Sequence, residues 1–269
     1  MTPESDLIFI IGRQRSGTTV LRKLLHQHGA VDCGEIFHGD FTREGNFYAY
    51  LLERIETEPS LVHPHRHAQV FAEYVEKLRA DANGAKIAMD VKYFALHLIP
   101  LPKIGIDTIP FILRFIRRQQ ASVLHLIRRN KLRVLVSAKL SRETDHWEQE
   151  RQDGPFENKP KISIHPKQAI RKIANMQEKD EMVEKLLANM PNCSRIYYEN
   201  MFSPDGNFSE ETLKIVKPIM GLDATSNVPE HIRMNPEPLE MLVENYADIR
   251  RELMNSSYRW MLEEDGAGT

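Results

Sequence analysis

Short apolar runs alternate with amphipathic stretches along most of the chain. Four runs have the length and composition of buried β-strands: residues 7–11, 86–91, 122–127 and 194–198. Apolar residues recur at helical spacing in seven further segments: 18–28, 67–81, 107–119, 130–142, 167–190, 209–220 and 237–254. Strands that alternate with helices are typical of a parallel sheet whose faces are covered by those helices. The pattern therefore predicts an α/β fold with a central parallel β-sheet flanked by helices.

Two segments need separate interpretation. Residues 237–254 carry a single apolar stripe, and the Asn235-Pro236 pair ahead of it favours a helix start, so we expect one continuous helix. Residues 142–166 show no apolar period, and a loop of that length inside a compact domain is usually functional or disordered. Trp147 favours a loop on the substrate side, and a surface insertion remains the alternative.

Length, charge and cysteine content limit the class of protein. The chain has 269 residues, of which 41% are hydrophobic, and we expect one domain spanning residues 1–269. Its formal net charge of −2 gives no field that would attract nucleic acid or an anionic membrane. No apolar run approaches the length of a membrane span, and the first residues are polar, so neither a transmembrane segment nor a signal sequence is expected. Cys33 and Cys193 form no pattern of disulfides or metal ligands, which favours a reducing, cytoplasmic location.

The residues after the first strand carry the most chemical information. Positions 12–19 read Gly-Arg-Gln-Arg-Ser-Gly-Thr-Thr and lie between a predicted strand and a predicted helix. A glycine-containing loop in this place directs backbone N–H groups and a helix N-terminus at a phosphate. The glycine spacing is that of a P-loop, but Thr18 stands where a nucleoside triphosphatase carries its lysine, and the positive charge moves to Arg15. The loop therefore predicts a phosphate-bearing ligand other than a nucleoside triphosphate.

A second candidate for anion binding follows the strand at 122–127. The helix predicted at 130–142 places Arg133 and Ser137 four residues apart on one face, with Arg129 one turn earlier. Two guanidinium groups and a hydroxyl on one face can bind a second phosphate. The alternative is a solvated basic helix face, which is the commoner use of such residues. The lysine-free P-loop makes phosphate binding the preferred interpretation.

Together the two motifs resemble those of sulfotransferases that use 3′-phosphoadenosine 5′-phosphosulfate (PAPS). The run Arg15-Ser16-Gly17-Thr18-Thr19 is similar to the first loop of that family. The pair Arg129-Asn130, with Ser137 eight residues after the arginine, is similar to its second motif. Three later segments also resemble family features: residues 196–201, 221–222 and 244–248. The resemblance spans most of residues 7–262 and is closest to bacterial carbohydrate and glycolipid sulfotransferases of the trehalose type.

The resemblance implies a P-loop-type sulfotransferase fold and transfer of a sulfuryl group from PAPS to an acceptor hydroxyl, with 3′-phosphoadenosine 5′-phosphate (PAP) as product. No metal is expected, because a sulfuryl group in transfer carries less charge than a phosphoryl group and positioned donors can stabilise it. The implied acceptor is a small molecule, a carbohydrate or a glycolipid, and the implied assembly is a homodimer. The residues implied to bind the donor are Arg13, Gln14, Arg15, Ser16, Gly17, Thr18, Thr19, Arg129 and Ser137, with Arg15 also stabilising the leaving group.

The acceptor hydroxyl must lose its proton, so this reaction requires a general base. Glu35 stands where trehalose-type enzymes carry a glutamate after the first helix, and its apolar neighbours would raise its pKa by burial. Cytosolic relatives use a histidine soon after a lysine-bearing strand. That position holds no histidine here, which makes His97 the second candidate and His38 the third. Lys92, which follows the strand at 86–91, is interpreted as an ordinary strand-end lysine, and a contact with donor or acceptor remains the alternative.

Two other functions stay open at this point. A P-loop kinase with a degenerate loop would depend on ATP and Mg²⁺, yet the chain offers neither the loop lysine nor a clear strand-end aspartate. A catalytically silent nucleotide-binding protein of the same fold would keep the phosphate motifs without turnover. The histidines at 63–67 are not interpreted as metal ligands, because Pro64 interrupts the helical spacing.

Overall fold

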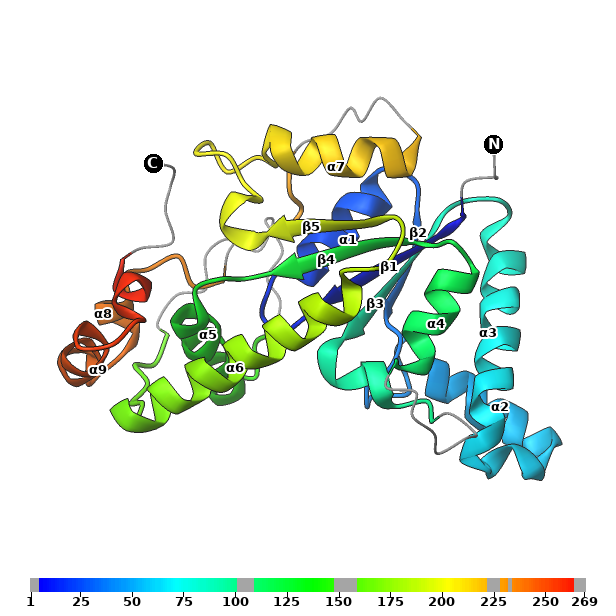
Figure 1. The fold of residues 1–269 in the computed structure, drawn as a ribbon, viewed down its shortest axis with the longest axis horizontal. Helices are drawn as coiled ribbons and strands as arrows, with labels where there is room; N and C mark the ends of the chain where they lie inside the picture. Colours follow the sequence, from blue (N-terminus) through cyan, green and yellow to red (C-terminus); the bar gives the residue numbers. More distant parts are fainter. Residues whose placement is uncertain (1–4, 101–108, 148–158, 222–227, 232–233, 264–269) are drawn as a thin grey trace.

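The computed structural model describes residues 5–100, 109–147, 159–221, 228–231 and 234–263, and five strands within these ranges form one parallel sheet. The strand order is β2-β3-β1-β4-β5 (Figure 1). The strands are β1 (Leu7–Gly12), β2 (Val31–Glu35), β3 (Ile87–Lys92), β4 (Ser122–Ile127) and β5 (Cys193–Tyr197). All four strand-like runs of the sequence are strands of this sheet, which confirms the predicted parallel α/β fold.

Strand β2 lies at the edge of the sheet and is missed by the hydrophobic pattern, because only Val31 and Cys33 of its five residues are apolar. Its pairing with β3 starts in a regular register and then shifts by one residue, so that Glu35 lies opposite Asp90. Gly34 lies within this bulge, and its φ of 71° is in the left-handed region that glycine adopts without strain. A one-residue shift moves a side chain to the other face of a sheet, so the bulge decides where Glu35 points.

Different helices cover the two faces of the sheet (Figure 1). Ile8 and Ile10 of β1 pack toward α1 (Thr18–Gln27) and α7 (Glu210–Met220). The alternate residues of the same strand pack toward the opposite layer, which contains α2 (Phe47–Thr57), α3 (His67–Ala82) and α4 (Phe111–Arg118). Such alternation is expected of a central strand that is buried on both faces.

Helix α2 falls in a segment for which no helix is predicted. Its helical start comes from Asn46, whose side chain accepts hydrogen bonds from the N–H groups of Tyr48 and Ala49. Phe47 and Leu51 anchor the helix in the core below the sheet. Four aromatic residues of this region pack in edge, stacked and tilted arrangements around Phe71: Phe37, Phe47, Tyr74 and Phe115. Aromatic packing therefore stabilises α2 despite its weak sequence signal.

A third apolar cluster joins the C-terminal helices to helices from the middle of the chain. Here α8 (Leu239–Leu242) and α9 (Tyr246–Met254) pack with α5 (Lys131–Thr144) and α6 (Pro166–Leu187). The prediction of one helix over 237–254 is wrong, because Val243 is extended between α8 and α9. Ile162 donates to the carbonyl of Leu242 and accepts from the N–H of Glu244, each at 2.9 Å. This pairing uses backbone groups that a continuous helix would have bonded internally.

The segment at 142–166 is only partly described, since residues 148–158 lie outside the described ranges. Its first residues complete α5, and Ile162 and Ile164 are buried in the third cluster. The described parts therefore pack against the body of the protein. Short 3₁₀ helices complete the assignment: η1 (Pro59–Val62), η2 (Pro64–Arg66), η3 (Tyr93–His97), η5 (Tyr198–Asn200) and η6 (Arg259–Leu262).

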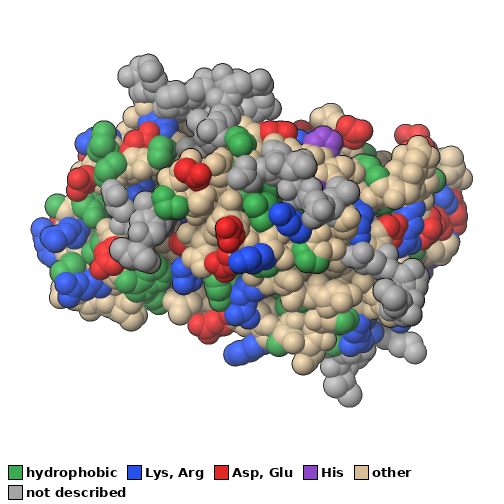
Figure 2. Space-filling model, turned by 90° about the horizontal axis from the view of Figure 1, so that it is seen from above, with side chains coloured by type: hydrophobic (Ala, Val, Ile, Leu, Met, Phe, Trp, Pro, Cys, Tyr) green, Lys and Arg blue, Asp and Glu red, His purple; other side chains and the backbone are tan. Residues whose placement is uncertain are grey.

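The surface shows no broad region of one charge on the face seen in Figure 2, where basic and acidic side chains are interspersed. Within the described ranges, no helix has the length and apolar character needed to cross a bilayer.

Candidate functional site

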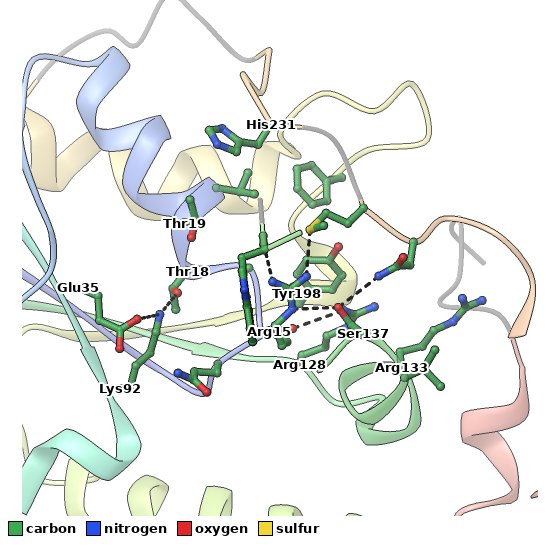
Figure 3. A pocket seen from close by; sticks show the side chains of 18 of the residues that line it. Arg15, Thr18, Thr19, Glu35, Lys92, Arg128, Arg133, Ser137, Tyr198 and His231 are labelled. Carbon is green, nitrogen blue, oxygen red and sulfur yellow. Dashed lines mark hydrogen bonds and ion pairs between the residues drawn. The ribbon is translucent and has the colours of Figure 1, made fainter. Parts of the chain in front are cut away.

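The carboxyl ends of all five strands supply residues to one cavity of about 410 Å³ (Figure 3). Glu35 ends β2, Lys92 ends β3, and the loop after β1 forms the floor. Arg128 and Tyr198 directly follow β4 and β5. Ligands of open parallel sheets bind at this edge, and the cavity has the size of a site for a small molecule. The topology thus gathers residues that are distant in sequence.

The loop after β1 has the backbone form of an anion cradle. Arg15 and Gly17 both have positive φ, 66° and 94°, and α1 begins directly afterwards at Thr18. No side chain caps the start of α1, which lies at the cavity. A Cβ at Gly17 would lie 2.7 Å from the ring of Tyr198, so any larger residue would push the loop and the ring apart. The helix N-terminus is therefore presented to a negatively charged ligand.

The two anion motifs of the sequence meet in this cavity. Nε of Arg15 donates to the hydroxyl of Ser137 at 3.0 Å, and another guanidinium nitrogen donates to the carbonyl of Trp147 at 2.5 Å. Arg133 and Ser137 both line the cavity from α5, as their spacing predicts. The side-chain amide of Asn235 donates to the same hydroxyl at 3.4 Å. Arg15 and Ser137 are thus close enough to contact one ligand.

Arg129 lies elsewhere. It precedes α5, its side chain is 50% exposed, and its Nε lies 3.5 Å from a carboxylate oxygen of Glu199. It is not among the described residues that line the cavity, whereas Arg128 is. Arg128 is 7% exposed, and its guanidinium lies over the ring of Tyr198 at 4.3 Å from the centroid. The doubled arginine gives no sequence signal for choosing between the two, because their side chains leave a turn rather than a regular helix face.

Two loop residues predicted to bind the donor also point away from the described cavity lining. Ser16 is buried, and its hydroxyl donates to the carbonyl of Arg13 at 2.6 Å. Arg13 turns toward α6, where it forms a 2.6 Å ion pair with Asp180 and donates to the carbonyl of Met176 at 2.7 Å. The remaining predicted loop residues, Gln14, Arg15, Gly17, Thr18 and Thr19, line the cavity.

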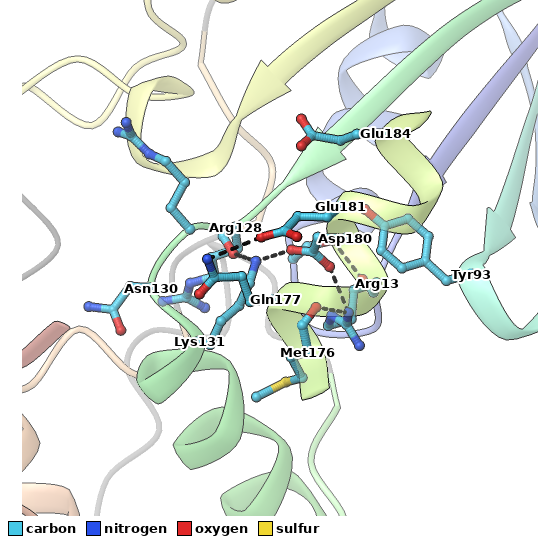
Figure 4. A network of polar contacts seen from close by, with 12 residues as sticks. Arg13, Tyr93, Arg128, Asn130, Lys131, Met176, Gln177, Asp180, Glu181 and Glu184 are labelled. Atoms are coloured by element: carbon cyan, nitrogen blue, oxygen red, sulfur yellow. Dashed lines mark hydrogen bonds and ion pairs between the residues drawn. The ribbon is translucent and has the colours of Figure 1, made fainter. Parts of the chain in front are cut away.

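Asp180 of α6 contacts residues from both the loop after β1 and the segment after β4 (Figure 4). Its second carboxylate oxygen pairs with the ammonium of Lys131, which also donates to the carbonyl of Arg128. Asp180 therefore connects Arg13 of the first loop with the turn that carries Arg128. Nearby, Tyr93 and Nε2 of His125 share a 2.7 Å hydrogen bond, and burial lowers the pKa of His125 to about 4. The imidazole is thus neutral at ordinary pH and serves packing rather than charge.

Glu35, Lys92 and Thr18 form the other end of the cavity (Figure 3). The ammonium of Lys92 lies 3.8 Å from Oε2 of Glu35 and donates to the hydroxyl of Thr18. Oε1 of Glu35 is buried and has no hydrogen-bond partner among the described residues. Burial raises the pKa of the Glu35 carboxyl above its usual value, and Lys92 opposes that shift. A carboxylate in this state can accept a proton from a bound hydroxyl.

The two histidines considered as alternative general bases lie in different places relative to the cavity. His97 is exposed on η3 and is not among the described lining residues, whereas His38 lines the cavity near Glu35. Lys92 is buried and its ammonium donates to the hydroxyl of Thr18 in the cavity, which favours the alternative of a contact with donor or acceptor. Thr18 is the residue that replaces the P-loop lysine. The neighbouring strand β3 thus supplies an ammonium beside Thr18, where the loop itself has no lysine.

Aromatic and apolar residues complete the cavity wall, and the sequence pattern does not single them out as a group. The wall includes Val20, Val136, Tyr198, Phe202, Met234 and Leu242. Of these residues, only Tyr198 could be assigned to the cavity from the sequence, because it directly follows β5 at the carboxyl edge of the sheet. In the described part of the chain, no three His, Cys, Asp or Glu side chains are grouped to hold a metal ion.

Comparison with known proteins gives a family for the chain. The model of the Sulfotransferase family matches residues 6–204, which include all five strands and the residues that line the Glu35–Lys92 end of the cavity. Among solved structures, the chain is similar to the sulfotransferase domain from the Synechococcus PCC 7002 olefin synthase. The two are 14% identical over 81% of this chain and 73% of that chain, with a TM-score of 0.38. No curated protein matches. Because the family match covers well over half of its length, the chain belongs to the sulfotransferase family.

Proposed function

We propose that the chain transfers a sulfuryl group from PAPS to a hydroxyl of an acceptor. The observation that carries the proposal is the arrangement of Thr18, Lys92 and Glu35: a P-loop without its lysine, a buried ammonium supplied by β3, and a carboxylate 3.8 Å from that ammonium. Cationic and hydroxyl groups at the opposite end, including Arg15 and Ser137, suit a second phosphate on the same ligand. A P-loop kinase would be expected to carry the loop lysine in whose place this chain has Thr18.

The proposed reaction is an in-line displacement. The acceptor oxygen attacks sulfur, the bond between sulfur and the 5′-phosphate oxygen breaks, and PAP leaves with the electron pair of that bond. The proton of the acceptor hydroxyl passes to Glu35. Lys92 and the N-terminus of α1 stabilise the negative charge that develops on the departing phosphate, and positioning supplies much of the rate. Arg15 contributes further positive charge beside the ligand.

The acceptor class is proposed from the motif resemblance, which favours a hydroxyl of a carbohydrate or glycolipid. The cavity supports a polar acceptor, because its Glu35 end also presents the side chains of His38 and Arg43. These residues follow β2 in a loop closed by Asn46, whose amide donates to the carbonyls of His38 and Asp40 at 2.8 and 3.1 Å.

Thermal shifts with nucleotides test the donor. PAP at about a hundred times its Kd is expected to stabilise the folded protein by about 2.7 kcal/mol, which raises Tm by roughly 5–10 °C. ATP with Mg²⁺ and adenosine at the same concentration are expected to give smaller shifts, since neither carries a 3′-phosphate. Transfer of labelled sulfate from PAPS to candidate acceptors then tests the reaction. Stabilisation by ATP with Mg²⁺ but not by PAP would favour the kinase alternative instead.

A matched pair of variants tests which arginine binds the nucleotide. Arg128→Gln is expected to weaken PAP binding about tenfold to a hundredfold, because it removes a charged donor from the cavity wall. Arg129→Gln is expected to change PAP affinity about twofold at most, because that side chain is half exposed, pairs with Glu199 and is outside the described cavity lining. Isothermal titration with PAP measures both. The reverse order of effects would restore the prediction made from the Arg129–Ser137 spacing.

A further inference from the structure

The pairing of β2 with β3 brings three charged side chains together. Residues that are two apart on a strand point to the same face, so Asp90 and Lys92 of β3 share one side of the sheet. The bulge in β2 places Glu35 opposite Asp90 rather than opposite Val91, as the register before the bulge would have it. Glu35 therefore joins the Asp90–Lys92 side of the sheet, at the edge that forms the cavity.

Lys92 does not share its ammonium equally between the two carboxylates. Nζ lies 2.6 Å from Oδ2 of Asp90 and 3.8 Å from Oε2 of Glu35. Asp90 is only 1% exposed and does not belong to the described cavity lining, so it cannot serve as a base for a bound acceptor. The third contact of the ammonium is the hydroxyl of Thr18, at the start of α1. A close ion pair in a buried site is much stronger than one lengthened by more than 1 Å.

We propose that Asp90 is a positioning residue, whose carboxylate holds the Lys92 ammonium against Thr18 and away from Glu35. Glu35 is then not neutralised by a close ion pair, and its carboxylate in the cavity can accept the proton of the acceptor. This inference rests on the proposed function, because it assigns Lys92 to the leaving phosphate and Glu35 to the acceptor. It explains how two oppositely charged groups in one small cavity avoid neutralising each other.

The charges around Glu35 give the sign of the expected change. Burial raises its pKa, Lys92 lowers it, and Asp90 raises it. His38 and Arg43, from the loop after β2, also lower it. From α1, Arg22 approaches Gly34 but pairs with Asp32 at 3.1 Å. Loss of the Asp90 charge is therefore expected to lower the pKa of Glu35 for two reasons. One negatively charged neighbour disappears, and the Lys92 ammonium can move closer to Glu35.

The variant Asp90→Asn keeps the shape of the side chain and removes its charge. The rate falls when Glu35 becomes protonated, so a lower pKa moves the acid limb of the kcat–pH profile to lower pH. We expect that limb to move down by about one pH unit. We expect the plateau kcat to fall about tenfold, because Lys92 is displaced from the leaving group. The smaller neutral variant Asp90→Ser is expected to shift the limb in the same direction.

Asp32→Asn is the matched control. Asp32 is another carboxylate on β2, but its ion pairs in the described structure are with Arg22 and Lys23. It is expected to leave the acid limb in place even where it lowers stability. A ¹³C carboxyl NMR titration of Glu35 in the PAP-bound protein reads the same pKa without turnover.

An unchanged acid limb and Glu35 titration in Asp90→Asn would overturn the inference, as would a shift to higher pH. Failure of both neutral variants to fold would make Asp90 a structural residue and would also overturn it. The proposed function fails separately, if the wild-type protein neither binds PAP nor transfers sulfuryl groups. In that event the NMR titration of the unliganded variants still decides whether Asp90 controls the charge on Glu35.

Discussion

Replacement of Glu35 by Gln is expected to lower kcat by about a hundredfold or more while leaving PAP affinity unchanged. The amide keeps the volume of the carboxyl group but cannot take the proton of the acceptor. Glu35 lines the same cavity as the loop after β1, which is why its carboxylate can meet both acceptor and donor. Steady-state sulfate transfer from PAPS and isothermal titration with PAP provide the two measurements.

The histidine variants make this result specific. His97→Ala is expected to keep near-normal turnover, because His97 is exposed on η3 away from the described lining. His38→Ala is expected to have an intermediate effect, since His38 lines the cavity beside Glu35 without a role in the proposed proton transfer. Near-normal turnover in Glu35→Gln, together with a large loss in either histidine variant, would assign the base to that histidine.

Replacement of Asp180 by Ala is expected to destabilise the fold by about 3–5 kcal/mol. Asp180 pairs with both Arg13 and Lys131, and the side chains of Asp180 and Lys131 are 8% and 5% exposed. Its removal leaves two poorly hydrated cations side by side without a counter-charge. Urea unfolding at neutral pH measures the free energy, and a fall in Tm of about 10 °C is the expected thermal counterpart.

Glu181→Ala is the matched control on the same helix. Glu181 accepts a hydrogen bond from Gln177 at 3.3 Å and is exposed, so its loss is expected to change stability by at most about 0.5 kcal/mol. The Asp180 variant should also weaken PAP binding, because Arg13 and the carbonyl of Arg128 lose their common anchor. Equal stability in the two variants would show that the network of Figure 4 contributes little to the fold.

The regular parts of the fold are accessible from the sequence because their apolar period matches their surroundings. Strand β1 is buried on both faces and reads as the unbroken run Leu7–Ile11. Helix α5 is predicted correctly from its sequence, with Arg133 and Ser137 on the face toward the cavity. The sequence pattern does not predict edge strand β2 or helix α2. Their stability depends on a partner strand and on aromatic packing rather than on regularly spaced apolar residues.

In the C-terminal region the sequence predicts a continuous helix that the structure interrupts. The apolar stripe of residues 239–253 has helical spacing throughout, yet the chain breaks at Val243. Hydrogen bonds to Ile162, which is far away in sequence, replace the helical bonds there. Spacing along the chain reports which residues are buried, but it does not report a backbone partner that arrives from another segment.

The order of residues along the chain determined the strand–loop–helix unit at 7–27, the missing P-loop lysine and the family of the protein. These features are local, since each depends on neighbours within a few positions. Only the tertiary structure decided that the Lys92 ammonium lies beside Thr18, that Glu35 lines the cavity and that Arg128 rather than Arg129 lines it. The physical reason is that strand order, a one-residue bulge and the direction of a turn place these side chains. The local pattern of apolar and polar residues does not indicate the strand order, the bulge or the direction of the turn.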